Sequence, residues 1–595
     1  MKKKGRRRGE VQVAAETNDM INALSVSIAG ADNDGLLRAA RAMERQGFEN
    51  ALRIDADVGT LCAWTHPAQR EVANCIVRTG SGIACCAGPL WYRGRFGAEA
   101  LLLLVEEVAE GGCVDEVALR GNFALYVRAG NHHWLLNDAL GLVRIYASGD
   151  GCFYSTSWLA VCAYLGRLEL DDASAVEYVL LGAAHSDQTV ARDVTLLPLG
   201  HGQDLGYRRT WRRFPGGMVP AGPDFRSFEE AVEVADAHLR RVFEEIAVAF
   251  PGAVNAALSG GFDSRLIVAG LLASGAMPKL FVYGAPRSAD ATIAKAVAAA
   301  VDLPISAVDK TTMDGASPPS DVESMVRGML FFDGLPNDGL HDAGADQRTR
   351  LQQNAAGCIA LNGGGGEVFR NFFHLPDRHF SAESIVRTFY RGFDPAVFRH
   401  PRALAAYEGR LAANIAGLPG IRERKHGARL DRSGVELAYP LFRCHYWMGA
   451  NNSISVRHGY YATPLVDLGT VRLAHHLPMA WKNAGRFEGR LIAGLNRRVA
   501  EQPSEYGFRF TDGPGRQARF SEWAHCMRPV SARWLVGAGR RRLRGVVVSP
   551  DMIRHYRTLL PGEWRLDPLL DLGRLPDNFA LARALAVEVV WRELA

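Results

Sequence analysis

The segment with the most specific chemistry is Ser259-Gly-Gly-Phe-Asp-Ser264, which joins an apolar segment, 253–258, to a helical pattern over 263–273. In a strand–turn–helix context, paired glycines let the backbone approach an anion, and the N–H groups of the turn and helix favour a phosphate. Asp263 binds phosphate only through a cation, so we expect it to hold Mg²⁺. The sequence therefore predicts a triphosphate or pyrophosphate site formed by Leu258, Ser259, Gly260, Gly261, Asp263 and Ser264.

The elements around this turn predict a parallel α/β sheet. Ser227 stands three residues before Glu230 as a capping box, and a long helix with one apolar face follows. Strands and helices then alternate, which is typical of a parallel sheet covered by helices. The predicted elements are strands at 253–258 and 280–283 and helices at 263–273 and 290–301, with helical patterns from 322 onward.

The region before residue 214 has a different pattern, with short alternating strands separated by Gly and Asn/Asp turns. We expect three of these strands, 123–127, 133–137 and 143–147, to be neighbours in an antiparallel sheet. Helical stretches at 35–46 and 98–108 complete an α+β layer fold. Segment 214–223 is rich in Pro and Gly and is typical of a linker.

Charge and cysteine content restrict the class of protein. The 595 residues contain 69 Lys+Arg and 64 Asp+Glu, and the net charge of +5 is too small for a dedicated nucleic-acid binder. No apolar run approaches the ~18 residues of a membrane span. The ten cysteines form no CxxC pair, and no secretory segment is evident, so we expect a cytoplasmic protein. Six of the first eight residues are Lys or Arg, and we expect 1–20 to be a disordered basic tail.

The SGGxDS turn resembles the pyrophosphate loop of the ATP-pyrophosphatase (PP-loop) families, whereas the GxxxxGK[ST] motif of Walker-type proteins is absent. Further landmarks resemble the asparagine synthetase branch: segment 283–294, the glycine-rich segment 361–369, and Pro464–Asp467. This resemblance implies ATP and Mg²⁺ as cofactors. It adds to the nucleotide site Tyr283, Gly284, Asn362, Gly363 and Gly364, and it makes Glu367 a second Mg²⁺ ligand beside Asp263.

Segments 119–124, 135–146 and 197–200 resemble the class II glutamine amidotransferase domain that precedes asparagine synthetases. That Ntn-hydrolase-like αββα sandwich uses an N-terminal Cys as nucleophile. Here the first cysteine is Cys62, in the middle of a predicted strand. We therefore expect a degenerate amidotransferase-like domain over 21–213, a linker over 214–226, and an α/β synthetase domain with helical additions over 227–595. The attacking amine must then come from a substrate.

Asparagine synthetase relatives without this Cys include the β-lactam synthetases and the cyclases of lasso peptide biosynthesis. The Tyr and Lys that mark β-lactam synthetases are missing: Gly364 stands at the first place and 489–492 carries no Lys. Segments 332–338, 363–373 and 506–510 are closer to the lasso cyclases. A β-lactam or carbapenam synthetase, an ammonia-dependent asparagine synthetase and an inactive peptide-binding scaffold remain alternatives.

This resemblance implies a ligase that adenylates an Asp or Glu side chain of a leaderless core peptide and joins it to the peptide's N-terminal amine. An isopeptide macrolactam, AMP and pyrophosphate result. Asp263 would hold Mg²⁺, Arg490 or Lys482 would neutralise the leaving phosphates, and Asp333 would orient the amine. The implied partners are a leader peptidase and a leader-binding protein, with no nucleic acid and no membrane.

Overall fold

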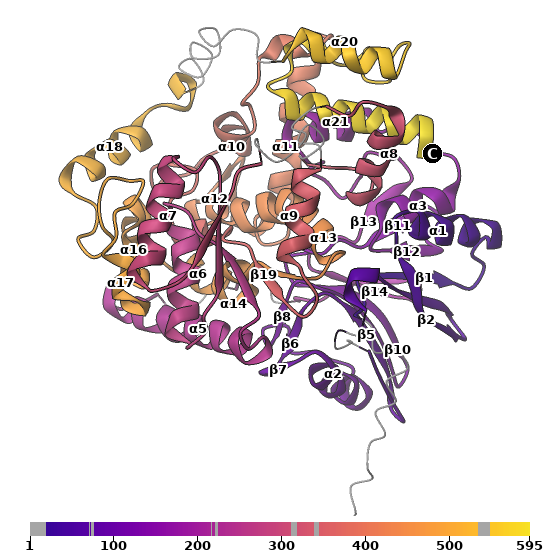
Figure 1. The fold of residues 1–595 in the computed structure, drawn as a ribbon, viewed down its shortest axis with the longest axis horizontal. Coiled ribbons are helices and arrows are strands. Elements are labelled where there is room, and N and C mark those ends of the chain that lie inside the picture. The colour runs from indigo at the N-terminus through magenta and orange to yellow at the C-terminus, as the bar shows by residue number, and fades with distance from the viewer. Residues whose placement is uncertain are drawn as a thin grey trace, which may run out of the picture.

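The computed structural model has a mixed α/β architecture with several sheets and many helices (Figure 1). The predicted tail 1–20 lies outside the described residues except for Met20, and the predicted linker 214–226 is described only in part. Among the helices of the described part, none is both long and apolar enough to cross a bilayer. The structure describes residues 20–70, 72, 76–215, 217–220, 224–310, 318–337, 344–533 and 548–594.

Two antiparallel six-stranded sheets form the N-terminal part, in the orders β13-β11-β12-β1-β3-β2 and β15-β14-β10-β9-β5-β4. The first sheet comprises β1 (Ala23–Ile28), β2 (Glu49–Ala56), β3 (Gly59–Thr65), β11 (Tyr146–Ser148), β12 (Phe153–Ser155) and β13 (Val194–Leu196). The second comprises β4 (Ile76–Thr79), β5 (Gly82–Ala87), β9 (Ala124–Ala129), β10 (His132–Asn137), β14 (His201–Asp204) and β15 (Arg209–Arg212). A three-stranded sheet of β6 (Leu90–Tyr92), β7 (Arg95–Phe96) and β8 (Leu119–Gly121) adjoins them.

Alternate residues of these strands point into a shared apolar core. Leu24, Val26 and Ile28 of β1 belong to the same buried cluster as Ile83 and Cys85 of β5. Helix α2 (Gly97–Gly111) packs on the second sheet, and α1 (Asn33–Arg45) packs with α3 (Trp158–Leu165), which contacts the first sheet. The predicted helices at 35–46 and 98–108 are confirmed.

The predicted strand 143–147 does not lie in the sheet that we expected. Residues 123–127 and 133–137 correspond to β9 and β10, which pair with each other, but β11 pairs with β12 and β13 in the other sheet. A buried turn explains the difference, because the carboxylate of Asp138 accepts from Leu142 N at 2.9 Å and from Val143 N at 2.8 Å. This turn carries the chain from one sheet to the other.

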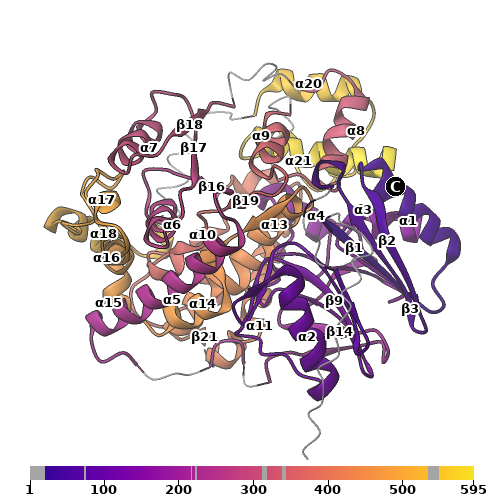
Figure 2. The same cartoon turned by 60° about the horizontal axis from the view of Figure 1, so that its bottom comes forward.

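The C-terminal part is built around a parallel sheet in the order β18-β17-β16-β19-β22 (Figure 2). Ser227 caps the long helix α5 (Phe228–Ala249) by accepting from Glu230 N at 3.1 Å, as predicted. The sheet strands are β16 (Val254–Ala257), β17 (Lys279–Tyr283), β18 (Ile305–Val308), β19 (Ile359–Leu361) and β22 (Tyr460–Ala462). A small hairpin joins β20 (Lys425–His426) to β21 (Arg429–Leu430).

Helices cover this sheet and fill the rest of the C-terminal part, as the patterns from residue 322 onward predict. They are α6 (Phe262–Ala273), α7 (Ala289–Ala300), α8 (Val322–Phe331), α9 (Ala345–Gln353), α10 (Ala382–Phe389), α11 (Ala403–Gly417), α12 (Arg432–Ala438), α13 (Gly449–Val456), α14 (Leu468–His475), α15 (Met479–Lys482), α16 (Arg486–Leu495), α17 (Arg497–Ala500), α18 (Arg516–Met527), α20 (Pro550–Leu559) and α21 (Asn578–Val589). The predicted strands and helices between 253 and 301 are confirmed within one or two residues.

Candidate functional site

The loop after β16 is folded tightly around its two serines. Ser264 Oγ accepts from Ser259 N at 3.0 Å and lies 2.9 Å from Ser259 Oγ. Helix α6 begins after Gly261, and no side chain caps it. Its N-terminus therefore keeps its partial positive charge available for an anion. Leu258, at the end of the strand, is buried and donates its N–H to Phe281 O at 2.8 Å.

Neighbouring elements hold this loop in place. Gly260 N donates to Asp290 Oδ1 of α7 at 3.1 Å, and Gly260 O accepts from Glu505 N at 3.2 Å. The loop after β17 lies beside it, where Gly284 N donates to Val308 O at 3.0 Å and Tyr283 is part-exposed. The predicted residues at the ends of β16 and β17 thus share one edge of the sheet.

The second glycine-rich loop, 362–366, meets the first at the point where the strand order reverses. β16 pairs with β17 on one side and with β19 on the other, so both loops leave the carboxyl ends of adjacent parallel strands. Ligands of open α/β sheets bind in the crevice at such a position. A Cβ atom on Gly363 would lie 3.3 Å from the Ser264 backbone, which shows how closely the loops pack. Asn362 Oδ1 accepts from Gly364 N at 2.9 Å and shapes this loop.

Three carboxylates converge on one guanidinium where the loops meet. Arg370 Nη2 lies 2.5 Å from Asp263 Oδ1 and 3.8 Å from Glu367 Oε1, and Arg370 Nε lies 2.9 Å from Glu488 Oε2. The side chain of Glu488, on α16, is 0% exposed. Gly366 leaves the room for this cluster, because a Cβ atom there would lie 2.6 Å from Asp263 Oδ1 and 2.7 Å from Glu488 Oε1.

The protonation of these carboxylates reflects burial and crowding. Burial, together with the nearby Glu367 carboxylate, raises the pKa of Asp263 to about 7 although Arg370 opposes the shift. Burial and the Asp263 charge raise the pKa of Glu488 well above its usual range. Burial also acts to raise the pKa of Glu367, but Arg370 and a hydrogen bond from Tyr439 bring it below its ordinary value. The cluster therefore binds protons that a divalent cation would displace.

Lys482 lies behind the acidic cluster rather than in it. Tyr439 donates to Glu367 Oε2 at 2.5 Å, and both residues line a small cavity together with Lys482 and Glu436. Lys482 Nζ lies 3.0 Å from Glu436 Oε2, and the lysine is 2% exposed. Its charge is therefore compensated within the protein.

The structure does not bring Arg490 and Asp333 to the loops. Arg490 lies on the exposed face of α16, whereas the buried Glu488 faces Asp263. Asp333 caps the distant helix α3: its carboxylate accepts from Ser157 Oγ and Trp158 N at 2.6 Å each. Arg457 lies 3.5 Å from the same carboxylate. Asp333 therefore forms a buried contact between the N-terminal and C-terminal parts.

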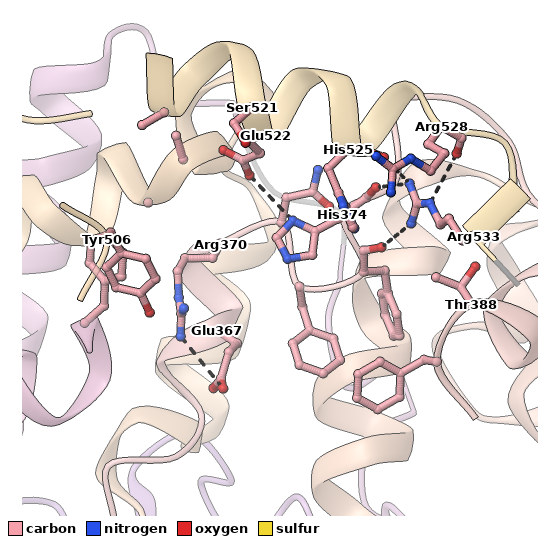
Figure 3. Close-up of a pocket in the computed structure, with 18 of the residues that line it drawn as sticks. Glu367, Arg370, His374, Thr388, Tyr506, Ser521, Glu522, His525, Arg528 and Arg533 are labelled. Atoms are coloured by element: carbon pink, nitrogen blue, oxygen red, sulfur yellow. Dashed lines mark hydrogen bonds and ion pairs between the residues drawn. The ribbon is translucent and has the colours of Figure 1, made fainter. Parts of the chain in front are cut away.

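A cavity of about 820 Å³ opens beside the acidic cluster (Figure 3). One wall carries Glu367 and Arg370, and another carries His525 and Arg528 of the region around α18. Aromatic side chains also line the cavity: Phe262, Phe372, Phe373, Phe389, Tyr506 and Phe508. Its size and aromatic character suit an organic ligand or a folded peptide segment.

Leu61 and Tyr126 belong to the apolar core between the two antiparallel sheets. Strands of both sheets also line a second, polar cavity of about 770 Å³, with Arg53, Asp55 and Arg128 among its residues. Cys62 of β3 is a free thiol whose pKa is raised by burial, which makes it a poor nucleophile.

Arg370 and Glu488 were missed by reasoning from the sequence. Arg370 lies just beyond the second glycine-rich segment, in a stretch noted only for its resemblance to lasso cyclases. Glu488 has one local signal: it interrupts an apolar helix face formed by Phe487, Leu491 and Ile492. A charged residue on such a face indicates a buried partner.

Comparison with known proteins adds no assignment, because no protein-family model and no curated protein matches this chain.

Proposed function

We propose that this chain is an ATP-dependent amide ligase of the asparagine synthetase-like type that acts as a lasso peptide cyclase. The observation that carries the proposal is the meeting of two glycine-rich loops, an uncapped helix N-terminus and three carboxylates at the strand-order reversal, beside a large aromatic cavity. In this proposal residues 227–595 form a PP-loop synthetase domain. Residues 21–213 form a degenerate amidotransferase-like αββα domain, and 214–226 link the two.

The residues at the loop junction fit a magnesium ion. Mg²⁺ prefers hard oxygen ligands, and Asp263 and Glu367 present carboxylates on either side of the junction. Neither oxygen of the fully buried Glu488 has a hydrogen-bond partner, so the cluster keeps oxygen atoms that are free to accept a further contact. Asp263 and Glu367 would hold the ion, whose positive charge would help to neutralise the phosphates.

The chain's own residues would then perform three tasks. Ser259, Gly261 and the N-terminus of α6 would bind the phosphates that leave as pyrophosphate. The aromatic walls of the cavity would exclude water and hold the folded peptide with its acidic side chain at the loop junction. The carboxylate displaces pyrophosphate from ATP, and the peptide's N-terminal amine then displaces AMP and loses a proton.

Two experiments test this function. A leaderless core peptide incubated with the protein, ATP and Mg²⁺ should lose one water by mass spectrometry and should support ATP–pyrophosphate exchange. AMP-coupled asparagine formation from free aspartate and ammonia would overturn the cyclase assignment. Absence of exchange with every core peptide would favour a peptide-binding scaffold. In the cell, a leader peptidase and a leader-binding protein would supply the core peptide.

A further inference from the structure

Arg370 binds a carboxylate that the proposed function assigns to Mg²⁺, that of Asp263. Its Nη2 lies 2.5 Å from Asp263 Oδ1, within an ordinary charge-assisted hydrogen bond. Arg370 follows the second glycine-rich loop, whereas Asp263 belongs to the first, so this ion pair ties the two loops together. The contact places a resident cation at the position where a nucleotide-bound cation would act.

Two cations cannot share this oxygen at low cost. At short range in a partly buried site, repulsion between a guanidinium and a divalent ion is several times stronger than in water. Asp263 is 17% exposed and Arg370 is 21% exposed, so water screens the pair only in part. Binding of Mg²⁺ at Asp263 therefore favours release of Oδ1 by the guanidinium. Phosphate oxygens are a suitable new partner, because arginine binds them in a bidentate, planar geometry.

Glu488 can hold Arg370 at the loop junction after the guanidinium has released Asp263. It lies 2.9 Å from Arg370 Nε, is fully buried, and comes from α16 rather than from either loop. The contact is an ion pair without hydrogen-bond alignment, because neither Glu488 oxygen has a hydrogen-bond partner. The Phe262 ring lies 5.3 Å from the guanidinium and supports it from one side. Glu488 and Phe262 can thus hold the base of the guanidinium while Nη2 changes partner.

We propose that Arg370 is an exchangeable counterion: it neutralises Asp263 in the nucleotide-free protein and transfers to the phosphates when Mg²⁺ and ATP bind, with Glu488 as its positioning residue. This inference rests on the proposed function. It assigns to Arg370 the phosphate-neutralising role that the sequence suggested for Arg490 or Lys482. In this proposal Arg370 also lowers the affinity of the site for a metal ion when no nucleotide is bound.

The exchange predicts opposite effects of one substitution on two ligands. In Arg370→Gln, the affinity for Mn²⁺ alone, measured by electron paramagnetic resonance, should rise about tenfold because the competing cation is gone. The affinity for α,β-methylene-ATP with Mg²⁺, measured by calorimetry, should fall at least about tenfold because a phosphate contact is lost. Adding Asp263→Asn to Arg370→Gln should remove the gain in Mn²⁺ binding. Arg490→Gln, on the exposed face of α16, is the matched control and should change neither affinity.

Each other outcome has a defined meaning. If Arg370→Gln weakens both ligands or leaves both unchanged, the counterion exchange is wrong and Arg370 is structural or irrelevant. If Arg370→Gln does not fold, Arg370→Lys is the test. Lysine has a shorter side chain with a point charge, so the Mn²⁺ affinity should rise and the nucleotide affinity should fall, each by about threefold. If the wild-type protein binds no α,β-methylene-ATP, both the proposed function and this inference fail. If it binds nucleotide but the two effects are not opposite, only the exchange fails.

Discussion

The carboxylate of Asp263 lies against Gly366, with Oδ1 2.6 Å from the position that a Cβ atom on Gly366 would occupy. Gly366 does not have a positive φ, so its backbone accepts alanine. The constraint on this position is therefore the neighbouring acidic cluster.

Gly366→Ala should thus impair the site without a backbone penalty. The added methyl group displaces the carboxylates of Asp263 and Glu488, and we expect nucleotide affinity to fall about tenfold, or about 1.4 kcal/mol. Gly409→Ala is the control, since it lies in α11 with nothing within 4 Å and should leave affinity unchanged while raising helix stability slightly. Calorimetry with α,β-methylene-ATP gives the comparison. Equal affinities in the two variants would mean that the loop junction does not bind nucleotide.

Asp263→Asn should remove the proposed metal ligand while keeping the side-chain volume. Peptide-dependent ATP–pyrophosphate exchange should fall roughly 100-fold or more, because the charge that neutralises the reacting phosphates is no longer held. The thermal unfolding midpoint, measured alongside, should not fall, since one of the crowded carboxylates is removed. Exchange at the wild-type rate would refute the assignment of Asp263.

Asp333→Ala should act on stability and not on chemistry. The substitution removes the acceptor of Ser157 Oγ and Trp158 N at the start of α3 and deprives the buried Arg457 of its carboxylate, which we expect to cost about 3 kcal/mol. Asp321→Ala, which removes an exposed cap from α8, should cost only about 1 kcal/mol. Urea unfolding measures both values. A large loss of ATP–pyrophosphate exchange in folded Asp333→Ala protein would instead support a catalytic role for Asp333.

Lys482→Met should likewise show that the ion pair of Lys482 with Glu436 is structural. Removing the lysine leaves Glu436 with less compensation, so the single variant should be destabilised by about 2 kcal/mol, and the double variant with Glu436→Gln should lose less than the sum of the two single changes. Exchange per folded molecule should change by less than about threefold. Wild-type stability combined with abolished exchange would contradict this view and favour the catalytic role suggested by the sequence.

Buried histidines should make the fold sensitive to mild acid. Burial lowers the pKa of His445 to about 4 and, with nearby arginines, that of His185 to about 3. Unfolded chains bind these protons near pH 6.5 and the folded protein does not, so stability should fall as the pH drops from about 6.5 to 4, by about 1.4 kcal/mol per pH unit for each histidine. His445→Gln should show a shallower decline in urea midpoints between pH 7.5 and 5. An unchanged slope would show that His445 does not contribute.

The sequence was sufficient for features that local spacing determines. The cap at Ser227, the apolar strand before Ser259 and the turn–helix that follows depend on neighbouring residues only, and all are observed. Strand partners were harder to predict. The pairing of β11 depends on a buried turn at Asp138, and a short strand carries no signal for which of two sheets it joins.

The candidate site was predictable only along its two loops. Asp263 and Glu367 stand in recognisable segments, and the structure brings them to one guanidinium. Glu488 reaches the same point from a helix far along the chain, and no spacing rule relates it to Asp263. The structure places Asp333 at the start of α3, and the sequence could not indicate this position because an aspartate in a turn has the same local pattern whether it faces a ligand or contacts a remote helix.

The parallel pairing of β16 with β19 also has a consequence for the order of folding. The two strands lie far apart in the chain, so the loops that follow them meet only after a large closure step has been completed. Glu488 lies still farther along the chain, on α16. Nucleotide affinity is therefore expected to be among the last properties recovered during refolding, after most secondary structure. ATP binding would then report on completion of the fold as well as on occupancy of the site.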